Sequence, residues 1–289
     1  MKKIGGVIAL ALCGLFWSTA GIFIKNVNAS SFTIAGLRSL IALATFIAVL
    51  KKFPGFTVRN PRGGIDKSGT FFLWLGGISY SGTMVLFCAA NKMTTSANAV
   101  LLQYSYPIYV ILFGPVILGE KNRRSDFITV AGVLVGVLLF FYSDIDAGKF
   151  LGNVLAALSG VCFAFTTIFM RKQKTSGSET SFMLAHLITA VACIPFYFKG
   201  GIASGDWTSI ICIYALGIFQ MAFANILFAR GIGSVTALGA SIITMIEPLM
   251  NPVWVMIFAG EIPGILCIAG GIMILGCILF REVIMSKEH

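Results

Sequence analysis

The chain has 289 residues, of which 57% are hydrophobic and only 11% are charged. A soluble domain needs roughly a quarter of its residues charged to keep its surface wet, so most of this protein's surface must face lipid. The net charge of +10 raises the question of a nucleic-acid partner. The basic residues, however, lie in short clusters between apolar runs, which is the pattern of loop charges that set membrane topology. We therefore expect no nucleic-acid binding.

A membrane-spanning helix needs about 20 predominantly apolar residues. In chain order the sequence predicts ten such spans, near residues 4–24, 32–50, 69–90, 97–118, 126–143, 150–170, 180–198, 207–229, 235–259 and 262–280. The first run follows two lysines, as in a signal peptide, but it exceeds the roughly 7–15 residues of a typical signal core. We expect it to form the first transmembrane helix.

The basic residues indicate how these spans are oriented. With a cytoplasmic N-terminus, sixteen of the 21 lysines and arginines fall on the cytoplasmic side and only four on the other side. Those four are Lys25, Lys92, Lys149 and Lys199. An excess of lysine and arginine marks cytoplasmic loops. The sequence therefore predicts a multi-pass protein of the cytoplasmic (inner) cell membrane with both termini in the cytoplasm.

Short motifs recur in the two halves of the chain in the same order. Ala11-Leu12-x-Gly14 returns as Ala157-Leu158-x-Gly160, and Lys25 corresponds to Arg171 at the same offset. Self-similarity of this kind is the mark of a repeat architecture. Five spans in each half is an odd number, so the two halves must enter the membrane in opposite orientations.

A second pair of segments strengthens the repeat. Residues 107–120 align with residues 248–261, with proline, glycine and glutamate in register. The predicted fold class is an all-α membrane protein of ten transmembrane helices, arranged as two inverted five-helix repeats over residues 1–146 and 147–289. Inverted repeats are common in transporters, whose substrate site lies near the bilayer midplane between the halves.

Together these features resemble the EamA family of the drug/metabolite transporter superfamily. The resembling residues are Leu15-Phe16-Trp17, Arg38, Tyr104-x-Tyr106-Pro107, Gly119-Glu120, Glu247-Pro248 and Gly260-Glu261. The resemblance covers the whole chain. It implies a ten-helix bundle in which helices one to four and six to nine surround a central cavity, with helices five and ten outside. It implies metabolite transport without fixing the substrate. Phe163 stands where many members have tryptophan.

Two charged residues lie within apolar spans. Glu247 is near the middle of its span, where a charge costs about 2.5–3.5 kcal/mol on insertion scales. It is a candidate for proton coupling or for binding a cationic substrate group, and equally for a structural role at a helix kink. Arg38 is predicted to extend outward to the interface, to pair with Glu247, or to meet an anionic substrate.

The remaining candidates are polar or aromatic. His186 is either a proton relay or a histidine bonded to a neighbouring helix. Gln103 and Tyr106 precede Pro107, whose bend frees a backbone carbonyl where helices line a cavity. The aromatic candidates for the walls of a substrate site are Trp17, Tyr80, Phe163 and Trp254, although aromatics in apolar helices usually serve packing.

The sequence predicts no metal site and no cofactor. All seven cysteines lie in apolar runs without a Cys-x-x-Cys pair, and no second histidine or carboxylate stands at ligand spacing from His186. The spans also lack a Ser/His dyad, paired aspartates or H-E-x-x-H, so we do not expect an enzyme. The partners expected are a small-molecule substrate and the lipid bilayer.

The leading hypothesis is a secondary transporter that moves an amino acid or related solute, by export and alternating access. No G-x-x-x-x-G-K-[ST] loop is present, so the driving force would be a gradient. The alternatives are an importer of another metabolite class, a channel, or a non-transporting sensor. Gly132-x-x-x-Gly136 predicts close helix packing, either within a monomer or across a homodimer.

Overall fold

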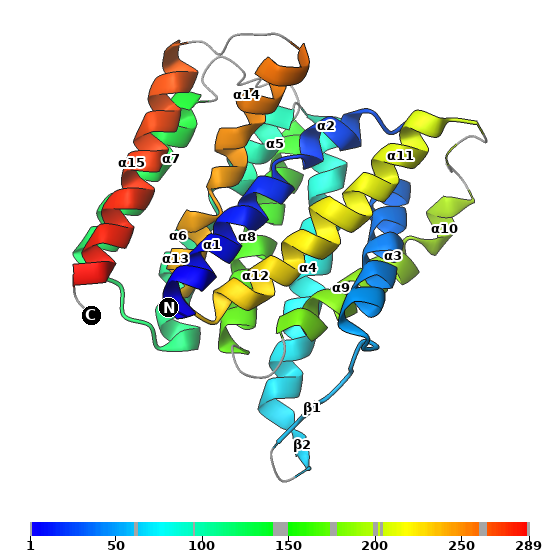
Figure 1. Cartoon of the computed structure of the whole chain (residues 1–289), viewed down its shortest axis with the longest axis horizontal. Coiled ribbons are helices and arrows are strands. Elements are labelled where there is room, and N and C mark those ends of the chain that lie inside the picture. Colours follow the sequence, from blue (N-terminus) through cyan, green and yellow to red (C-terminus); the bar gives the residue numbers. More distant parts are fainter. Residues whose placement is uncertain are drawn as a thin grey trace.

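The protein is a bundle of helices with one small hairpin (Figure 1). The computed structural model describes residues 2–60, 63–94, 96–140, 150–173, 178–198, 202, 205–259 and 265–287. Two features predicted from the sequence lie outside these residues. They are the junction between the two repeats, after residue 146, and the motif Gly260-Glu261. Within them, five helical segments are long and apolar enough to cross a bilayer: Ile4–Lys25, Ser31–Leu50, Lys67–Met93, Phe150–Lys172 and Trp207–Ile232.

The described residues of the first half of the chain form seven helices. They are α1 (Lys2–Trp17), α2 (Ala20–Lys25), α3 (Ser31–Leu50), α4 (Lys67–Met93), α5 (Ser96–Gln103), α6 (Tyr106–Leu118) and α7 (Arg124–Phe140). The second half contains α8 (Phe150–Lys172), α9 (Ser178–Ala192), α10 (Ile194–Tyr197), α11 (Trp207–Ala215), the π-helix η2 (Leu216–Phe223), α12 (Ala224–Ile232), α13 (Ala237–Ile243), α14 (Ile246–Ala259) and α15 (Ile265–Lys287). Each apolar run of the sequence coincides with one helix or with consecutive ones.

Two of the predicted spans are interrupted at matching places. The helix expected over residues 97–118 breaks between α5 and α6, and the one expected over 235–259 breaks between α13 and α14. The second helix begins just before a proline in each case, one residue before Pro107 in α6 and two residues before Pro248 in α14. Proline lacks an N–H and clashes with the carbonyl one turn back, so it fits the first turn of a helix better than the interior, where α6 also carries Pro115.

Four of the described helices begin with a side-chain cap. Four capping residues accept a hydrogen bond from the backbone N–H three residues later: Ser30, Asp66, Asp206 and Thr236. Such a cap satisfies one of the N–H groups that have no partner inside the helix. Because unpaired backbone groups are costly away from water, these caps fix where the helices begin.

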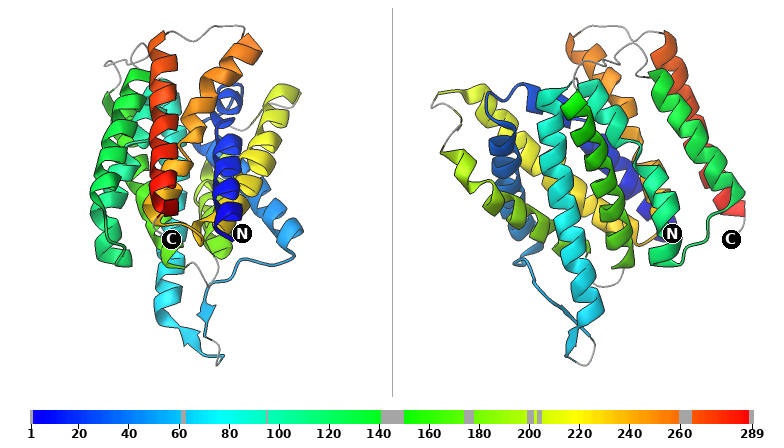
Figure 2. Two further views of the ribbon diagram at one scale, coloured as in Figure 1. Left: turned by 60° about the vertical axis from the view of Figure 1, so that its left-hand side comes forward. Right: turned by 180° about the vertical axis from the view of Figure 1, so that it is seen from behind.

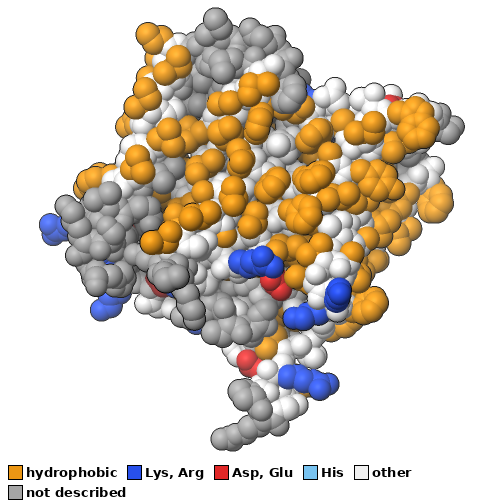
Figure 3. Space-filling model, viewed as in Figure 1, with side chains coloured by type: hydrophobic (Ala, Val, Ile, Leu, Met, Phe, Trp, Pro, Cys, Tyr) orange, Lys and Arg blue, Asp and Glu red, His pale blue; other side chains and the backbone are white. Residues whose placement is uncertain are grey.

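The two chain ends and the hairpin lie at one end of the bundle, which we call the terminal face (Figures 1 and 2). The hairpin pairs β1 (Val58–Arg59) with β2 (Ile65–Asp66) in antiparallel fashion and leads directly into α4. Figure 3 shows hydrophobic side chains over the face formed by α1, α11 and α12, with lysines and arginines toward the terminal face. This distribution is that of a surface facing lipid.

Helices α7 and α15 pack against each other along their length, at one side of the bundle (Figure 1). The glycines of the expected Gly132-x-x-x-Gly136 motif lie in this seam. A Cβ atom added at Gly136 would stand 2.8 Å from the Ile274 side chain and 3.1 Å from the Gly270 carbonyl oxygen. The motif therefore serves close packing within one chain.

We predict that Gly136→Ala lowers the melting temperature, because the added methyl group pushes α15 away and overpacking costs about 1–3 kcal/mol. The matched control is Gly276→Ala on α15, where a Cβ would meet nothing within 4 Å. Thermal unfolding in detergent measures both variants, and size-exclusion chromatography with light scattering measures their oligomeric state. A Gly136→Ala protein that keeps its stability but changes oligomeric state would contradict this assignment.

Candidate functional site

A small cavity of about 40 Å³ lies at the centre of the bundle. Both halves of the chain contribute to its wall, from α1, α3, α4 and α5 on one side and from α8, η2 and α14 on the other. Its lining residues are Trp17, Arg38, Tyr80, Thr83, Met84, Phe87, Gln103, Phe163, Gln220, Met221 and Glu247. The lining includes an arginine, a glutamate and two glutamines. Charged side chains within membrane-spanning segments are rare and usually functional.

Six residues singled out from the sequence line this cavity, namely Trp17, Arg38, Tyr80, Gln103, Phe163 and Glu247. Sequence reasoning missed the rest of the α4 wall, although a signal was present. Thr83, Met84 and Phe87 follow Tyr80 at the spacing i+3, i+4 and i+7, which places four side chains on one helix face. Gln220 and Met221 depend on the π-helix η2, which no pattern in the sequence marks.

The other three candidates do not line the cavity and instead hold its surroundings together. Tyr106 donates from its hydroxyl to the Ser241 carbonyl at 2.5 Å and lies 2.7 Å from the Thr244 hydroxyl. Trp254 donates to Ser18 at 2.8 Å, beside the break between α1 and α2. His186 forms a hydrogen bond with a buried asparagine, Asn225.

Tyr106 connects the two interrupted helix pairs of the protein. It is the first residue of α6, and its two partners lie at the end of α13 and in the break before α14. Tyr106 and Glu247 hold equivalent positions, since each directly precedes the proline of its own half. The break in one half is thus tied by a hydrogen bond to the break in the other half.

The repeated glycines of the two halves also meet these breaks. A Cβ at Gly14 would stand 3.0 Å from the Thr244 carbonyl oxygen, and a Cβ at Gly160 would stand 2.7 Å from the Gln103 carbonyl oxygen. Only a residue without a side chain lets α1 and α8 approach the interrupted backbone so closely. The equivalent glycines of the two halves therefore each pack against one of the two breaks.

Asn225 on α12 is the hub of a buried polar network beside the cavity. Its Oδ1 accepts hydrogen bonds from the Trp17 indole at 3.2 Å and from the Tyr80 hydroxyl at 2.8 Å. An indole N–H only donates, so this atom of Asn225 must be the oxygen and the other must be the amide nitrogen. That nitrogen lies 3.0 Å from His186 Nε2. His186 accordingly accepts at Nε2 and carries its ring proton on Nδ1.

Arg38 does not extend to the membrane interface, and it does not pair with Glu247. Only 1% of the residue is exposed, and it lines the cavity from α3. Its Nη2 donates to the Met84 carbonyl at 3.3 Å, while Nε and Nη1 have no partner among the described residues. Glu247, in the first turn of α14, lies beside the Tyr104 hydroxyl but outside hydrogen-bond geometry.

Buried polar atoms without a partner are concentrated at this place. In the described part of the chain there are five, on Arg38, Tyr104, His186 and Gln220. Arg38 and Gln220 line the cavity, Tyr104 lies beside Glu247, and His186 is bonded to the hub asparagine. Native proteins pair nearly all such groups, so a cluster of exceptions is a mark of function.

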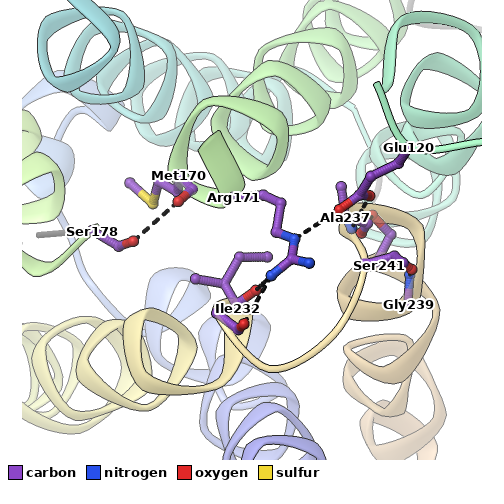
Figure 4. Close-up of polar contacts among 10 residues, drawn as sticks. Glu120, Met170, Arg171, Ser178, Ile232, Ala237, Gly239 and Ser241 are labelled. Atoms are coloured by element: carbon purple, nitrogen blue, oxygen red, sulfur yellow. Dashed lines mark hydrogen bonds and ion pairs between the residues drawn. The ribbon is translucent and has the colours of Figure 1, made fainter. Parts of the chain in front are cut away.

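At the terminal face a polar latch, made by Glu120 and Arg171, joins several helices (Figure 4). Arg171, near the end of α8, donates from Nε to the Glu120 carboxylate at 2.8 Å and from Nη1 to the carbonyls of Ile232 and Gly233 at 3.1 and 2.8 Å. The second carboxylate oxygen of Glu120 accepts from the Ala237 N–H at 3.0 Å. The latch thus ties the loop after α6 to α8, the end of α12 and the start of α13.

We predict that Glu120→Ala separates the ends of α6 and α12. Hydrogen bonds to charged groups contribute about 1.5–3 kcal/mol each, so their loss shifts a two-state equilibrium by roughly tenfold or more. Spin labels at the exposed positions Val116 and Arg230, in a background without native cysteines, report the distance by double electron–electron resonance. Lys121→Ala, the removal of the neighbouring exposed charge, serves as control. An unchanged distance distribution in Glu120→Ala would show that the latch does not hold the ends of α6 and α12 together.

Comparison with known proteins gives a consistent result. The sequence model of the EamA-like transporter family matches the chain twice, over residues 4–142 and 150–281. An uncharacterized transporter of Archaeoglobus fulgidus is 26% identical over 277 residues, covering 95% of each chain. The pseudopaline exporter CntI of Pseudomonas aeruginosa is 24% identical and covers 93% of each chain.

Two further similarities agree with these. The threonine/homoserine exporter RhtA of Escherichia coli K12 is 24% identical over 188 residues, which cover 64% of this chain and 62% of the exporter. A chain of a solved crystal structure superposes with a TM-score of 0.78 at 16% identity, covering 98% of both chains, so the two share a fold. Because the family match extends over both halves, this chain belongs to the EamA-like transporter family and is a membrane transporter, not an enzyme.

Proposed function

We propose that the protein is a secondary transporter that carries a small metabolite across the cytoplasmic membrane by alternating access. The observation that carries this proposal is the central cavity, whose wall comes from both halves and holds most of the unpartnered buried polar atoms. Transporters built from repeats bind their substrates at such a place, near the midplane and beside interrupted helices. The cavity therefore serves as the substrate site.

The architecture we propose is ten transmembrane helices in two inverted five-helix repeats, residues 1–146 and 147–289. Two family matches in one chain support it. It is also supported by the equivalent breaks before Pro107 and Pro248 and by the glycines Gly14 and Gly160, each packed on one break. In this arrangement one half rocks against the other around the cavity, and the contact between the two breaks is the pivot.

The orientation we propose places both termini, and hence the terminal face, in the cytoplasm. The excess of basic residues in the loops on this side supports it. The latch between Glu120 and Arg171 then lies on the cytoplasmic side of the cavity, and we propose that its hydrogen bonds close the cavity to the cytoplasm in this state. Release of the latch opens the cavity to cytoplasmic substrate.

The proposed substrate is an amino acid or a related solute, and the proposed direction is export. Two relatives are named exporters, one of threonine and homoserine and one of pseudopaline. The cavity supports a small substrate, since it combines charged and amide groups with the aromatic walls Trp17, Tyr80 and Phe163. Import of another metabolite class, a channel and a sensor are the competing functions.

Flux through the purified protein in liposomes tests the proposal. Vesicles loaded with unlabelled amino acid should take up the radiolabelled form faster than empty vesicles, and the rate should saturate with concentration. A channel would give flux without saturation, a sensor would give none, and either result would rule out a carrier. Protein-free vesicles and vesicles with Gly276→Ala protein provide the background and the positive control.

We predict that Glu247→Gln abolishes proton-driven accumulation, whereas counterflow exchange continues with a weaker apparent affinity for the substrate. Glutamine keeps the size of the side chain and an acceptor oxygen but cannot take up a proton, so coupling to the proton gradient is lost while exchange remains. Uptake driven by an imposed pH gradient measures the first process, and counterflow without a gradient measures the second. Glu179→Gln, in the first turn of α9, is the matched control. Unchanged gradient-driven uptake in Glu247→Gln would leave this glutamate with a structural role alone.

A further inference from the structure

The environment of Arg38 is unusual among the basic residues of the protein. Arg171 forms hydrogen bonds to one carboxylate and two carbonyls, so its charge is paired. Arg38 is more deeply buried and makes one hydrogen bond, at 3.3 Å to the Met84 carbonyl. Among the described residues no carboxylate lies within ion-pair distance of it. The fold thus buries a full positive charge with little protein to balance it.

The free groups of this guanidinium can be counted. Nε carries one N–H and Nη1 carries two, and neither nitrogen has a partner in the part of the chain that the structure describes. A buried charge without a partner is among the most destabilising features a protein can contain. The vacant donors therefore call for an anionic acceptor that enters and leaves the cavity.

Two side chains with hydrogen-bond acceptor groups face the same cavity. The Oε1 atom of Gln220 is a buried acceptor to which no described residue donates, and Glu247 contributes a carboxyl group to the lining. Gln220 is carried by the π-helix η2, a rare element that is frequent at functional sites. A ligand that suits all three residues has an acidic group for Arg38 and a cationic N–H donor for Gln220 and Glu247.

We propose that Arg38 is the carboxylate-binding residue of the cavity and that Gln220 and Glu247 receive the ammonium group of the same small zwitterion. The acidic group is a carboxylate and not a phosphate ester, because a dianion would need further basic residues and Arg38 is the only basic residue among the described residues of the lining. This inference rests on the proposed function, since it names the chemistry of the transported solute.

Binding to the wild-type protein in detergent tests this inference without any mutation. The probes are the twenty common α-amino acids, each compared with its decarboxylated amine and its deaminated acid, together with inorganic phosphate. A thermal-shift assay reports binding because a ligand of the folded state raises the melting temperature. We expect stabilisation by one or more amino acids and little or none by the corresponding amines. Stabilisation by amines alone, by phosphate alone, or by no probe would overturn the proposal.

Variants of Arg38 separate a binding role from a structural one. Arg38→Gln should weaken binding of the stabilising amino acid by about 10- to 100-fold, the loss expected for hydrogen bonds to a charged group. Arg38→Lys should restore part of the affinity, because it keeps the charge but not the planar fork. Ser39→Ala, the next residue on α3 and outside the cavity lining, is the matched control and should bind as wild type.

The melting temperature without ligand gives an independent readout. Because Arg38 is an unpaired buried charge, Arg38→Gln should melt at the same temperature as wild type or higher. A structural arginine would give a clear decrease in both Arg38→Gln and Arg38→Lys, and that result would overturn the proposal. If Arg38→Gln does not fold, the comparison of amino acids with amines on wild-type protein still decides.

Failure of this inference and failure of the transporter proposal give different results. Counterflow of amines, with no requirement for a carboxylate, would remove the role of Arg38 and leave the carrier intact. Carboxylate-dependent binding without any flux would keep the site and remove the carrier.

Discussion

Inside a bilayer a polar group has no water to bind, so every N–H, C=O and charge must find its partner within the protein or remain costly. Most of this structure follows from that constraint. Capping residues such as Ser30 close the helix starts, the hub Asn225 joins Trp17, Tyr80 and His186, and Arg171 binds the carbonyls at the end of α12. Against this background of satisfied groups, the unpartnered atoms around the central cavity become informative.

The cavity exists because each half of the chain contains an interrupted helix. The breaks before Pro107 and Pro248 leave backbone groups near the centre, and Gly14 and Gly160 let the neighbouring helices approach them. The two breaks differ in the side chain that precedes the proline. Tyr106 bonds across to the other half, whereas Glu247 turns toward the cavity. The two equivalent positions therefore differ in role, since Tyr106 bonds across the halves and Glu247 faces the cavity.

Much of this could be predicted from the sequence because it rests on periodic or charged patterns. Apolar runs gave the helices, and intramembrane charge indicated Arg38 and Glu247. The residues that sequence reasoning placed in the site but that lie outside the lining, Tyr106, His186 and Trp254, each have a hydrogen-bond partner on a distant segment. Such pairing depends on the packing of helices far apart in the chain. The position of Gln220 in the lining also depends on packing. It lies on the π-helix η2, which packs closely against α3 at Gly217.

The central claim is that one cavity is reached from the two sides of the membrane in turn. The most direct measurement is the reaction of a membrane-impermeant thiol reagent with a single cysteine at position 83, a lining position, in otherwise cysteine-free protein. The reagent is applied from either side of oriented vesicles. The account predicts reaction from both sides, protection by bound substrate, and a faster cytoplasmic reaction when Glu120 is replaced by alanine. Reaction from one side only, unaffected by the loss of Glu120, would contradict it.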